Sequence, residues 1–174
     1  MENNNYYIAI DLGAESGRVI VGTLMNQKLL MKEIHRFPTK QIVENDTSYW
    51  DLNFIYLQIQ EGIKKASALG YNKPSGIGID SWAVDFGLLD ENDELIELPI
   101  TYRDKRTDGM MEKVFEIIPK SQIYKSTGIQ FLKFNSIFQL FSLVIDRQEI
   151  LGKAKSFLMI PDLLNFFLRI SSSS

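Results

Sequence analysis

The chain has 174 residues, of which 45% are hydrophobic, and this is enough to bury the core of one domain or two small ones. Its net charge of -3 and its scattered lysines favour neither a nucleic acid nor an anionic membrane as a partner. The absence of cysteine excludes disulfides, thiolate catalysis and cysteine zinc sites, and it fits a reducing cytoplasm.

The first predicted elements are strands. Residues 1–5 are polar and lack the basic start and apolar run of a secretory signal, so we expect a short flexible tail. Strands are predicted over 6–12, 18–24 and 30–37, joined by short turns. Because the connections are short, these three strands should form an antiparallel opening to a sheet.

A helix is predicted next, from a cap at Asp51 to an end at Gly70. Its apolar residues recur at helical spacing. They are Leu52, Ile55, Ile59, Ile63 and Ala66. A buried strand should follow at 75–80, then a hairpin of 84–89 and 94–98 around a solvated acidic turn, and then mostly helices. This order of elements is typical of an α/β fold.

The carboxyl-terminal part is the most apolar. Residues 157–170 are too short and too often interrupted by polar residues to cross a bilayer, so they predict a core strand followed by a helix. The aromatic residues Phe134, Phe138 and Phe141 have helical spacing and are expected in the core. His35, the only histidine, is expected to be packed or on the surface and to belong to no site.

The turn between the first two strands has the composition of a phosphate-binding loop. Gly13 and Gly17 allow backbone N–H groups to approach an anion, Ser16 adds a hydroxyl and Arg18 a fixed positive charge. A P-loop and a dinucleotide motif are excluded, because β-branched residues rather than a helical pattern follow the turn. An ordinary hairpin with a polar loop remains the alternative.

Two short apolar strands end in aspartate, 8–11 in Asp11 and 77–80 in Asp80. If these strands are parallel, both carboxylates reach the same edge of the sheet, where ligands bind in open α/β folds. Paired oxygen ligands suit Mg²⁺ that is held through waters against phosphates. In the alternative, Asp80 merely ends a strand or starts a turn.

Several segments together resemble the FGGY carbohydrate kinases, and within them most closely the rhamnulokinase branch. They are 11–18, 33–37, 78–86, 102–107, 128–131, 134–140 and 159–162. The resemblance implies an α/β fold, the actin-like ATPase (ribonuclease H-like) amino-terminal domain, with a mixed sheet that opens β-β-β-α-β and is incomplete. It also implies that residues 1–170 are a truncated amino-terminal, sugar-binding domain and that 171–174 are a low-complexity tail.

The resemblance further implies an enzyme that uses ATP and Mg²⁺ to phosphorylate a ketose, with L-rhamnulose giving L-rhamnulose 1-phosphate. It implies that Asp11 binds Mg²⁺, with Asp80 as a weaker candidate. The residues that it implies as contacts of the ATP phosphates are Gly13, Ala14, Glu15, Ser16, Gly17 and Arg18. The residues that it implies as the lining of the sugar pocket are Trp82, Ala83 and Asp85. Further polar contacts with the sugar are expected from Tyr102, Arg103, Asp104 and Arg106.

The catalytic base is not identified, because the family's base is expected beyond residue 174; the chain alone is therefore expected to be inactive. Two alternatives stay open. One is another kinase of the same family, acting on fuculose, xylulose or ribulose, and the other is a non-catalytic sugar or nucleotide sensor with the same fold. Residues 103–106 also have a plainer interpretation, as a surface patch of ion pairs.

Overall fold

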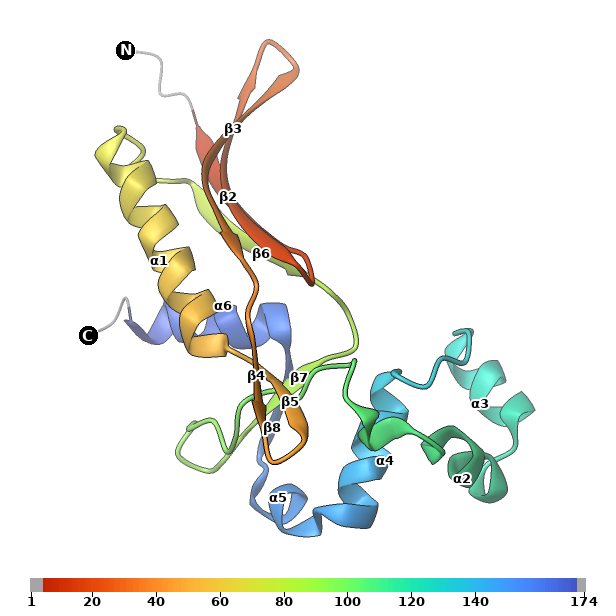
Figure 1. The fold of residues 1–174 in the computed structure, drawn as a ribbon. Helices are drawn as coiled ribbons and strands as arrows, with labels where there is room; N and C mark the ends of the chain where they lie inside the picture. The colour runs from red at the N-terminus through yellow and green to blue at the C-terminus, as the bar shows by residue number, and fades with distance from the viewer. Residues whose placement is uncertain (1–4, 172–174) are drawn as a thin grey trace. The chain divides into compact units, whose positions relative to one another are not determined.

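The structure is a computed structural model that describes residues 5–171, the side chains of the last two excepted. The chain forms two compact units (Figure 1). The first contains the residues up to 41, residues 50–83 and those from 160 onward, and the second contains residues 42–49 and 84–159. Among the described residues, no helix is long and apolar enough to cross a membrane.

The first unit is built on a four-stranded sheet. Its strands are β1 (Tyr6–Leu12), β2 (Ser16–Met25), β3 (Lys28–Pro38) and β6 (Gly76–Ser81). They lie in the order β3-β2-β1-β6, with β1 antiparallel to β2 and parallel to β6. The antiparallel opening and the strand near residues 75–80 are therefore confirmed, and the sheet is mixed as expected. The predicted burial of that strand is wrong, because no residue of β6 is buried and Ile77 is 41% exposed.

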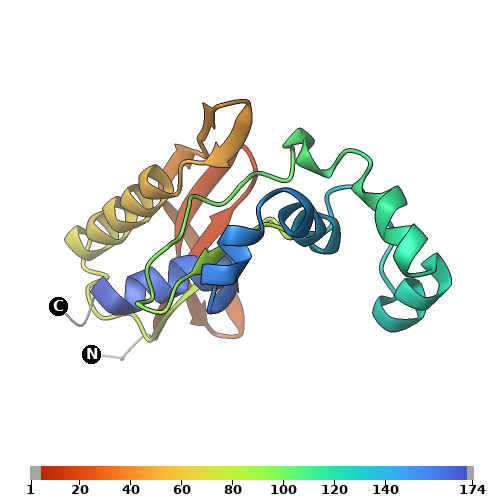
Figure 2. The ribbon, with the colours of Figure 1, turned by 90° about the horizontal axis from the view of Figure 1, so that it is seen from below.

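Two helices cover one face of this sheet, α1 (Leu52–Ala68) on β2 and β3, and α6 (Ile160–Ser171) on β6 (Figure 2). The predicted start of α1 is confirmed, because the Asp51 carboxylate accepts a hydrogen bond from the Phe54 N–H at 3.0 Å. Gly62 brings α1 close to the sheet, since a Cβ there would overlap the Val19 side chain. At the helix end, Gly70 has a φ of 95°.

Strand alternation decides which side chains the helices cover. Ile8, Ile10 and Leu12 of β1 are buried and point toward the helices. Tyr7 and Asp11 alternate with them and point to the opposite face, where Tyr7 is 51% exposed. This uncovered face carries the charged residues described below.

The second unit combines short strands with helices. Its strands are β7 (Phe86–Leu89) and β8 (Ser156–Met159), which pair antiparallel, and most of the β4 (Gln41–Glu44) and β5 (Thr47–Trp50) hairpin. Its helices are η1 (Lys105–Thr107), α2 (Met110–Ile117), α3 (Lys120–Thr127), α4 (Ser136–Asp146) and α5 (Gln148–Lys153).

Two hydrophobic clusters hold these elements together. One joins β7 to α4 and α5 through Phe86, Leu88, Leu143 and Ile150. The other joins α2, α3 and α4 through Met110, Val114, Ile123 and Phe138. The expected core position of Phe138 is confirmed, and Phe141 is partly buried against the same cluster.

The predicted hairpin of 84–89 and 94–98 is only partly right. Leu89 and Leu95 form an isolated bridge, and the Ile96 N–H donates to the Leu88 carbonyl at 3.0 Å, but 94–98 is not a strand. The other pairing edge of β7 belongs instead to β8, nearly seventy residues away in the chain. The predicted strand and helix of 157–170 are confirmed as β8 and α6.

Some expectations concern the chain ends. The predicted flexible tail at 1–5 falls mainly on residues 1–4, which lie outside the described residues. The same holds for 172–174 of the predicted serine tail, whereas Ser171 is the last residue of α6.

Candidate functional site

The turn between β1 and β2 is closed by its own backbone and by Thr39. The Gly13 N–H donates to the Ser16 carbonyl at 2.9 Å, so it serves the turn itself. Thr39 donates its N–H to the Glu15 carbonyl at 3.1 Å and its hydroxyl to the Gly13 carbonyl at 3.1 Å. The predicted phosphate-binding residues thus lie on a short, fixed turn in which Gly13 and Glu15 are exposed.

Neither glycine of this turn uses the positive φ that glycine permits. The described glycines with positive φ are Gly70, Gly109 and Gly128, and neither glycine of the turn is among them. Gly17 is required by packing, since a Cβ there would lie 2.5 Å from the Phe37 ring and 2.8 Å from Leu12.

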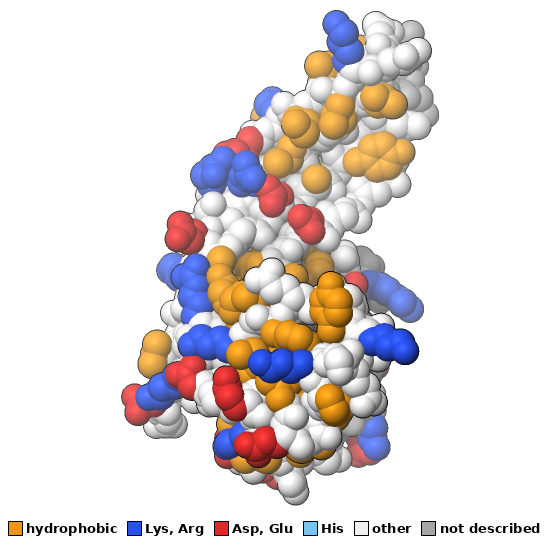
Figure 3. All heavy atoms as spheres, turned by 90° about the vertical axis from the view of Figure 1, so that its right-hand side faces the viewer, with side chains coloured by type: hydrophobic (Ala, Val, Ile, Leu, Met, Phe, Trp, Pro, Cys, Tyr) orange, Lys and Arg blue, Asp and Glu red, His pale blue; other side chains and the backbone are white. Residues whose placement is uncertain are grey.

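A row of four charged residues crosses the sheet beside this turn. Asp80 of β6 is in register with Asp11 of β1, Asp11 with Arg18 of β2, and Arg18 with Arg36 of β3. We call these four residues the charged row. Residues in register point to the same face, and Figure 3 looks onto that face, where acidic and basic side chains gather below an apolar area.

Three residues of the charged row form ion pairs, one pair within the row and one with Glu33 beside it. The Asp11 carboxylate pairs with the Arg18 guanidinium, and both side chains are partly exposed, at 37% and 40%. Arg36 forms a two-pronged pair with Glu33, at 3.0 and 2.6 Å. Hydrogen bonding to Arg36 lowers the pKa of Glu33, and the same contact raises the pKa of Arg36.

The acidic end of the row suits a magnesium ion. Asp11 and Asp80 are neighbours on parallel strands, and both carboxylates are accessible. Within residues 5–171 no group of three or more acidic or histidine side chains is arranged to hold a metal. Asp11 and Asp80 are thus two neighbouring carboxylates, and Mg²⁺ is commonly held in proteins by one or two carboxylates with waters and phosphates.

In the first unit, two of the predicted sugar residues follow β6. The Trp82 ring packs against Trp50, with ring centroids 4.2 Å apart, and Trp50 is completely buried. The Ser81 hydroxyl donates to the Trp82 carbonyl at 3.1 Å. Ala83 is exposed.

In the second unit, Asp85 lies inside a buried polar network. It is completely buried and accepts hydrogen bonds from the Tyr102 N–H at 3.1 Å and from the Gln139 amide at 3.0 Å. The Gln139 amide nitrogen also lies 2.8 Å from the Phe134 carbonyl, and its Oε1 accepts from Arg106 at 2.6 Å. Gln139 therefore joins the carboxylate to the guanidinium.

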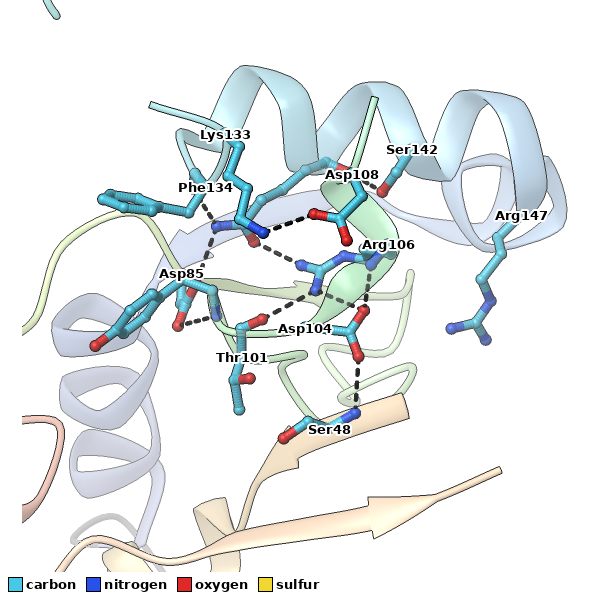
Figure 4. Close-up of polar contacts among 12 residues, drawn as sticks. Ser48, Asp85, Thr101, Asp104, Arg106, Asp108, Lys133, Phe134, Ser142 and Arg147 are labelled. Carbon is cyan, nitrogen blue, oxygen red and sulfur yellow. Dashed lines mark hydrogen bonds and ion pairs between the residues drawn. The ribbon is translucent and has the colours of Figure 1, made fainter. Parts of the chain in front are cut away.

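Asp104 and Arg106 complete this network. Asp104 is 6% exposed and accepts from the Ser48 N–H at 2.9 Å and the Arg106 N–H at 2.8 Å. Arg106 also donates to the Thr101 carbonyl at 3.1 Å (Figure 4). Burial lowers the pKa of Arg106, against the attraction of Asp104 and Asp85. A surface patch of ion pairs is therefore wrong for Asp104 and Arg106.

Arg103 is the exposed member of the predicted sugar residues in this unit. Its guanidinium lies 5.4 Å from the centre of the Tyr102 ring, and its Nε–H donates to the Tyr102 hydroxyl at 3.2 Å. The Tyr102 ring in turn makes an edge contact with Phe134, at 5.6 Å between centroids. Arg103 and Tyr102 thus form one partly exposed surface.

The candidate site residues predicted from the sequence do not include Gln139, Ser136 or Val84. Gln139 is completely buried beside Phe138. Its amide stands among the apolar residues of α4, and this contrast in the sequence could have indicated a buried polar residue. Val84 carries no such signal. It has a φ of 74°, and its carbonyl accepts from the Ser136 hydroxyl at 2.8 Å and the Gln139 amide at 3.2 Å.

Solved structures with the same fold are sugar kinases, so the chain has the actin-like ATPase fold. The gluconate kinase of Lactobacillus acidophilus matches 94% of this chain and 33% of its own, with a TM-score of 0.80 and 21% identity. The xylulose kinase of the same organism matches 88% of this chain and 31% of its own, with a TM-score of 0.74 and 21% identity.

The family follows from the sequence comparison. Residues 6–170 match the model of the N-terminal domain of the FGGY family of carbohydrate kinases. The chain therefore belongs to the FGGY family of carbohydrate kinases.

Among curated proteins, the chain is 53% identical over 161 residues to a rhamnulokinase of Oceanobacillus iheyensis, covering 92% of this chain and 34% of that protein. It is 48% identical over 164 residues to a rhamnulokinase of Halalkalibacterium halodurans, covering 94% and 35%. It is 43% identical over 162 residues to that of Bacillus subtilis, covering 93% and 33%. The chain thus spans about a third of the length of these relatives.

Proposed function

We propose that this chain is the amino-terminal, sugar-binding part of an ATP-dependent ketose kinase, and that its substrate is L-rhamnulose, phosphorylated to the 1-phosphate. The observation that carries this proposal is the acidic end of the charged row, where Asp11 and Asp80 stand in register beside the β1–β2 turn. The likeness to the rhamnulokinases supports the choice of sugar.

The nucleotide side of the proposal uses the β1–β2 turn and the charged row. Asp11, with Asp80 beside it, would hold Mg²⁺, which when bound neutralises charge on the phosphates during transfer. The N–H groups of Ala14 and Glu15, the Ser16 hydroxyl and the Arg18 guanidinium are the groups assigned to the ATP phosphates. Gly13 and Gly17 shape the turn, through its closing hydrogen bond and its packing on Phe37.

The sugar side of the proposal separates contact from support. Trp82, Ala83 and Arg103 are assigned to direct contact with the ketose, because their side chains are at least partly exposed. Asp85 and Asp104 are buried and accept hydrogen bonds from backbone N–H groups. We assign them to holding the backbone around residues 48 and 102 in place rather than to contact with the sugar.

The remaining parts of the proposal concern the whole protein. Residues 1–170 belong to the sugar-binding domain, and 171–174 are a low-complexity tail. The base that accepts the proton of the sugar hydroxyl is assigned to the two thirds of the relatives that this chain does not span. A cytoplasmic location, where ATP and Mg²⁺ are available, belongs to the same proposal.

The test is a coupled assay of ADP formation by the full-length protein with ATP, Mg²⁺ and a panel of ketoses. The panel contains L-rhamnulose, fuculose, xylulose and ribulose. We expect the highest kcat/KM for L-rhamnulose, because a mismatched hydroxyl leaves buried polar groups unpaired. A higher value for another ketose would move the protein to another branch of the family, and no ketose-dependent ADP formation would refute the kinase.

A further inference from the structure

Val84 has a backbone conformation that its side chain disfavours. The other described non-glycine residues with positive φ are Asn26, Gln27, Asn45, Asp46 and Asp93, all polar and all in short turns between strands or along the acidic loop. Val84 is β-branched, and a β-branched residue at positive φ is a genuine outlier. Such conformations persist only where the surroundings enforce them, and they cluster at functional sites.

The first turn of α4 enforces this conformation. The Ser136 hydroxyl and the Gln139 amide both donate to the Val84 carbonyl, at 2.8 and 3.2 Å. Gln139 is itself fixed, because Arg106 donates to its Oε1 at 2.6 Å. The peptide that joins Val84 to Asp85 is thus held from two side chains of one helix.

This peptide leads directly into the buried network. Asp85 follows Val84 and accepts the Tyr102 N–H at 3.1 Å, and Tyr102 carries the Arg103 guanidinium on its ring. A relaxation of the Val84 backbone that turns this peptide would move the Asp85 carboxylate away from that N–H. The Tyr102 and Arg103 surface depends on this contact for its position.

We propose that Ser136 is a positioning residue for sugar recognition, which acts by holding Val84 in its strained conformation. This inference rests on the proposed function, since it concerns the surface that the proposed kinase offers to its ketose. Gln139 contributes to the same hold, but it also binds Asp85 and Arg106, so Ser136 is the cleaner residue to test.

The test is a double-mutant cycle in the full-length protein between Ser136→Ala and Val84→Gly. Ser136→Ala removes the hold, so Val84 can relax, and we expect the KM for L-rhamnulose to rise about threefold to tenfold, the equivalent of one neutral hydrogen bond. The KM for ATP should change less than twofold. Val84→Gly alone should be close to wild type, because glycine adopts positive φ without strain.

The decisive variant combines both changes. Glycine needs no hold to keep this conformation, so Val84→Gly should suppress the defect and bring the ketose KM of the double variant back within about twofold of wild type. If the Ser136 hydrogen bond only stabilised the fold, the effects of the two substitutions would be additive instead. Ser136→Cys, of similar size and with a weak donor, replaces Ser136→Ala if that variant does not fold.

Ser142→Ala is the matched control. The Ser142 hydroxyl is buried on the same helix and donates to the Gln139 carbonyl at 2.7 Å, so its removal costs a similar hydrogen bond without touching Val84. A ketose KM of Ser136→Ala equal to that of Ser142→Ala, or a double variant that keeps the defect, overturns the inference. An inactive wild type would instead refute the proposed function. In that case the same four proteins are compared by thermal unfolding, and additive effects of Ser136→Ala and Val84→Gly on stability would show that Ser136 does not hold Val84 in its conformation.

Discussion

Asp11 and Asp80 stand directly opposite each other on adjacent parallel strands, although they are 69 positions apart in the chain. Two like charges side by side repel each other. Among residues 5–171, Arg18 pairs with Asp11, and no ion pair involves Asp80. The arrangement therefore favours a cation at this end of the charged row.

Asp11→Asn tests the proposed magnesium ligand. We expect kcat of the full-length protein to fall by about 10² to 10³, the usual loss when one group that stabilises transition-state charge is removed. Folding should change little, because the partly exposed pair with Arg18 contributes only about 0–1 kcal/mol. Activity is measured with saturating ATP and Mg²⁺, and stability by thermal unfolding.

The control for that variant is Asp46→Asn, at a side chain that is 89% exposed in the β4–β5 turn. Asparagine tolerates the positive φ of this position, so turnover should stay at the wild-type level. Normal turnover by Asp11→Asn would rule out its role as metal ligand.

Gly17→Ala tests the packing role of this glycine. An added Cβ meets the Phe37 ring at 2.5 Å, so we expect a loss of about 1–3 kcal/mol in the free energy of unfolding, as for other overpacked cores. Gly13→Ala should cost less, since its nearest neighbour is 3.3 Å away. In the double variant Gly17→Ala/Phe37→Leu, the smaller leucine side chain should recover part of the lost free energy of unfolding. If urea unfolding finds no recovery, the clash with Phe37 is excluded as the cause.

The two carboxylates Glu97 and Glu33 should affect stability with opposite dependence on pH. Burial raises the pKa of Glu97 and outweighs the attraction of Arg147, so the folded state favours its protonated form. That contribution is complete below the unfolded pKa of about 4.5 and is lost as pH rises through the folded pKa. The lowered pKa of Glu33 gives a contribution that is present above about 4.5 and lost as pH falls.

Both contributions are measured as the free energy of urea unfolding of Glu97→Gln and Glu33→Gln, each compared with wild type. The measurements run between pH 3.5 and 7 in ~0.5 pH steps, a range that includes the ordinary carboxyl pKa. The difference from wild type should move in opposite directions with pH for the two variants. Parallel curves would show that burial does not dominate at Glu97.

Arg106 offers a structural prediction. Its Nε is buried and has no hydrogen-bond partner among the described residues, and Arg106 and Glu97 line a cavity of about 20 Å³. That volume suffices for one water molecule, which needs polar partners of this kind. A crystal structure at high resolution should show a water bonded to Arg106 Nε, whereas a dry cavity would mean that the donor is truly unsatisfied.

Local patterns in the sequence predicted the first unit well. Short apolar stretches separated by turns predicted β1 to β3. A capping residue at Asp51, followed by apolar residues at helical spacing, predicted α1. The two similar strands that both end in aspartate suggested a shared sheet edge if they were parallel, and the pairing of β1 with β6 meets that condition. These features depend on neighbours in the chain or on the general rules of α/β sheets.

The second unit depends on distant contacts, and these could not be predicted. The pairing of β7 with β8 joins residues about seventy positions apart, and the polar segment around residues 41–50 forms a hairpin without a strong apolar pattern. The burial of Arg106 depends on Gln139 of α4, 33 residues further on. From sequence alone, a charged segment of this kind is more simply placed on the surface.

A crystal structure of the full-length protein with Mg²⁺ and a non-hydrolysable ATP analogue tests the central claim most directly. We predict the metal in contact with Asp11, directly or through one water, and the phosphates within hydrogen-bond distance of the turn between β1 and β2. A nucleotide whose phosphates lie away from this turn, with Asp11 still paired to Arg18 and no metal beside it, would contradict the account.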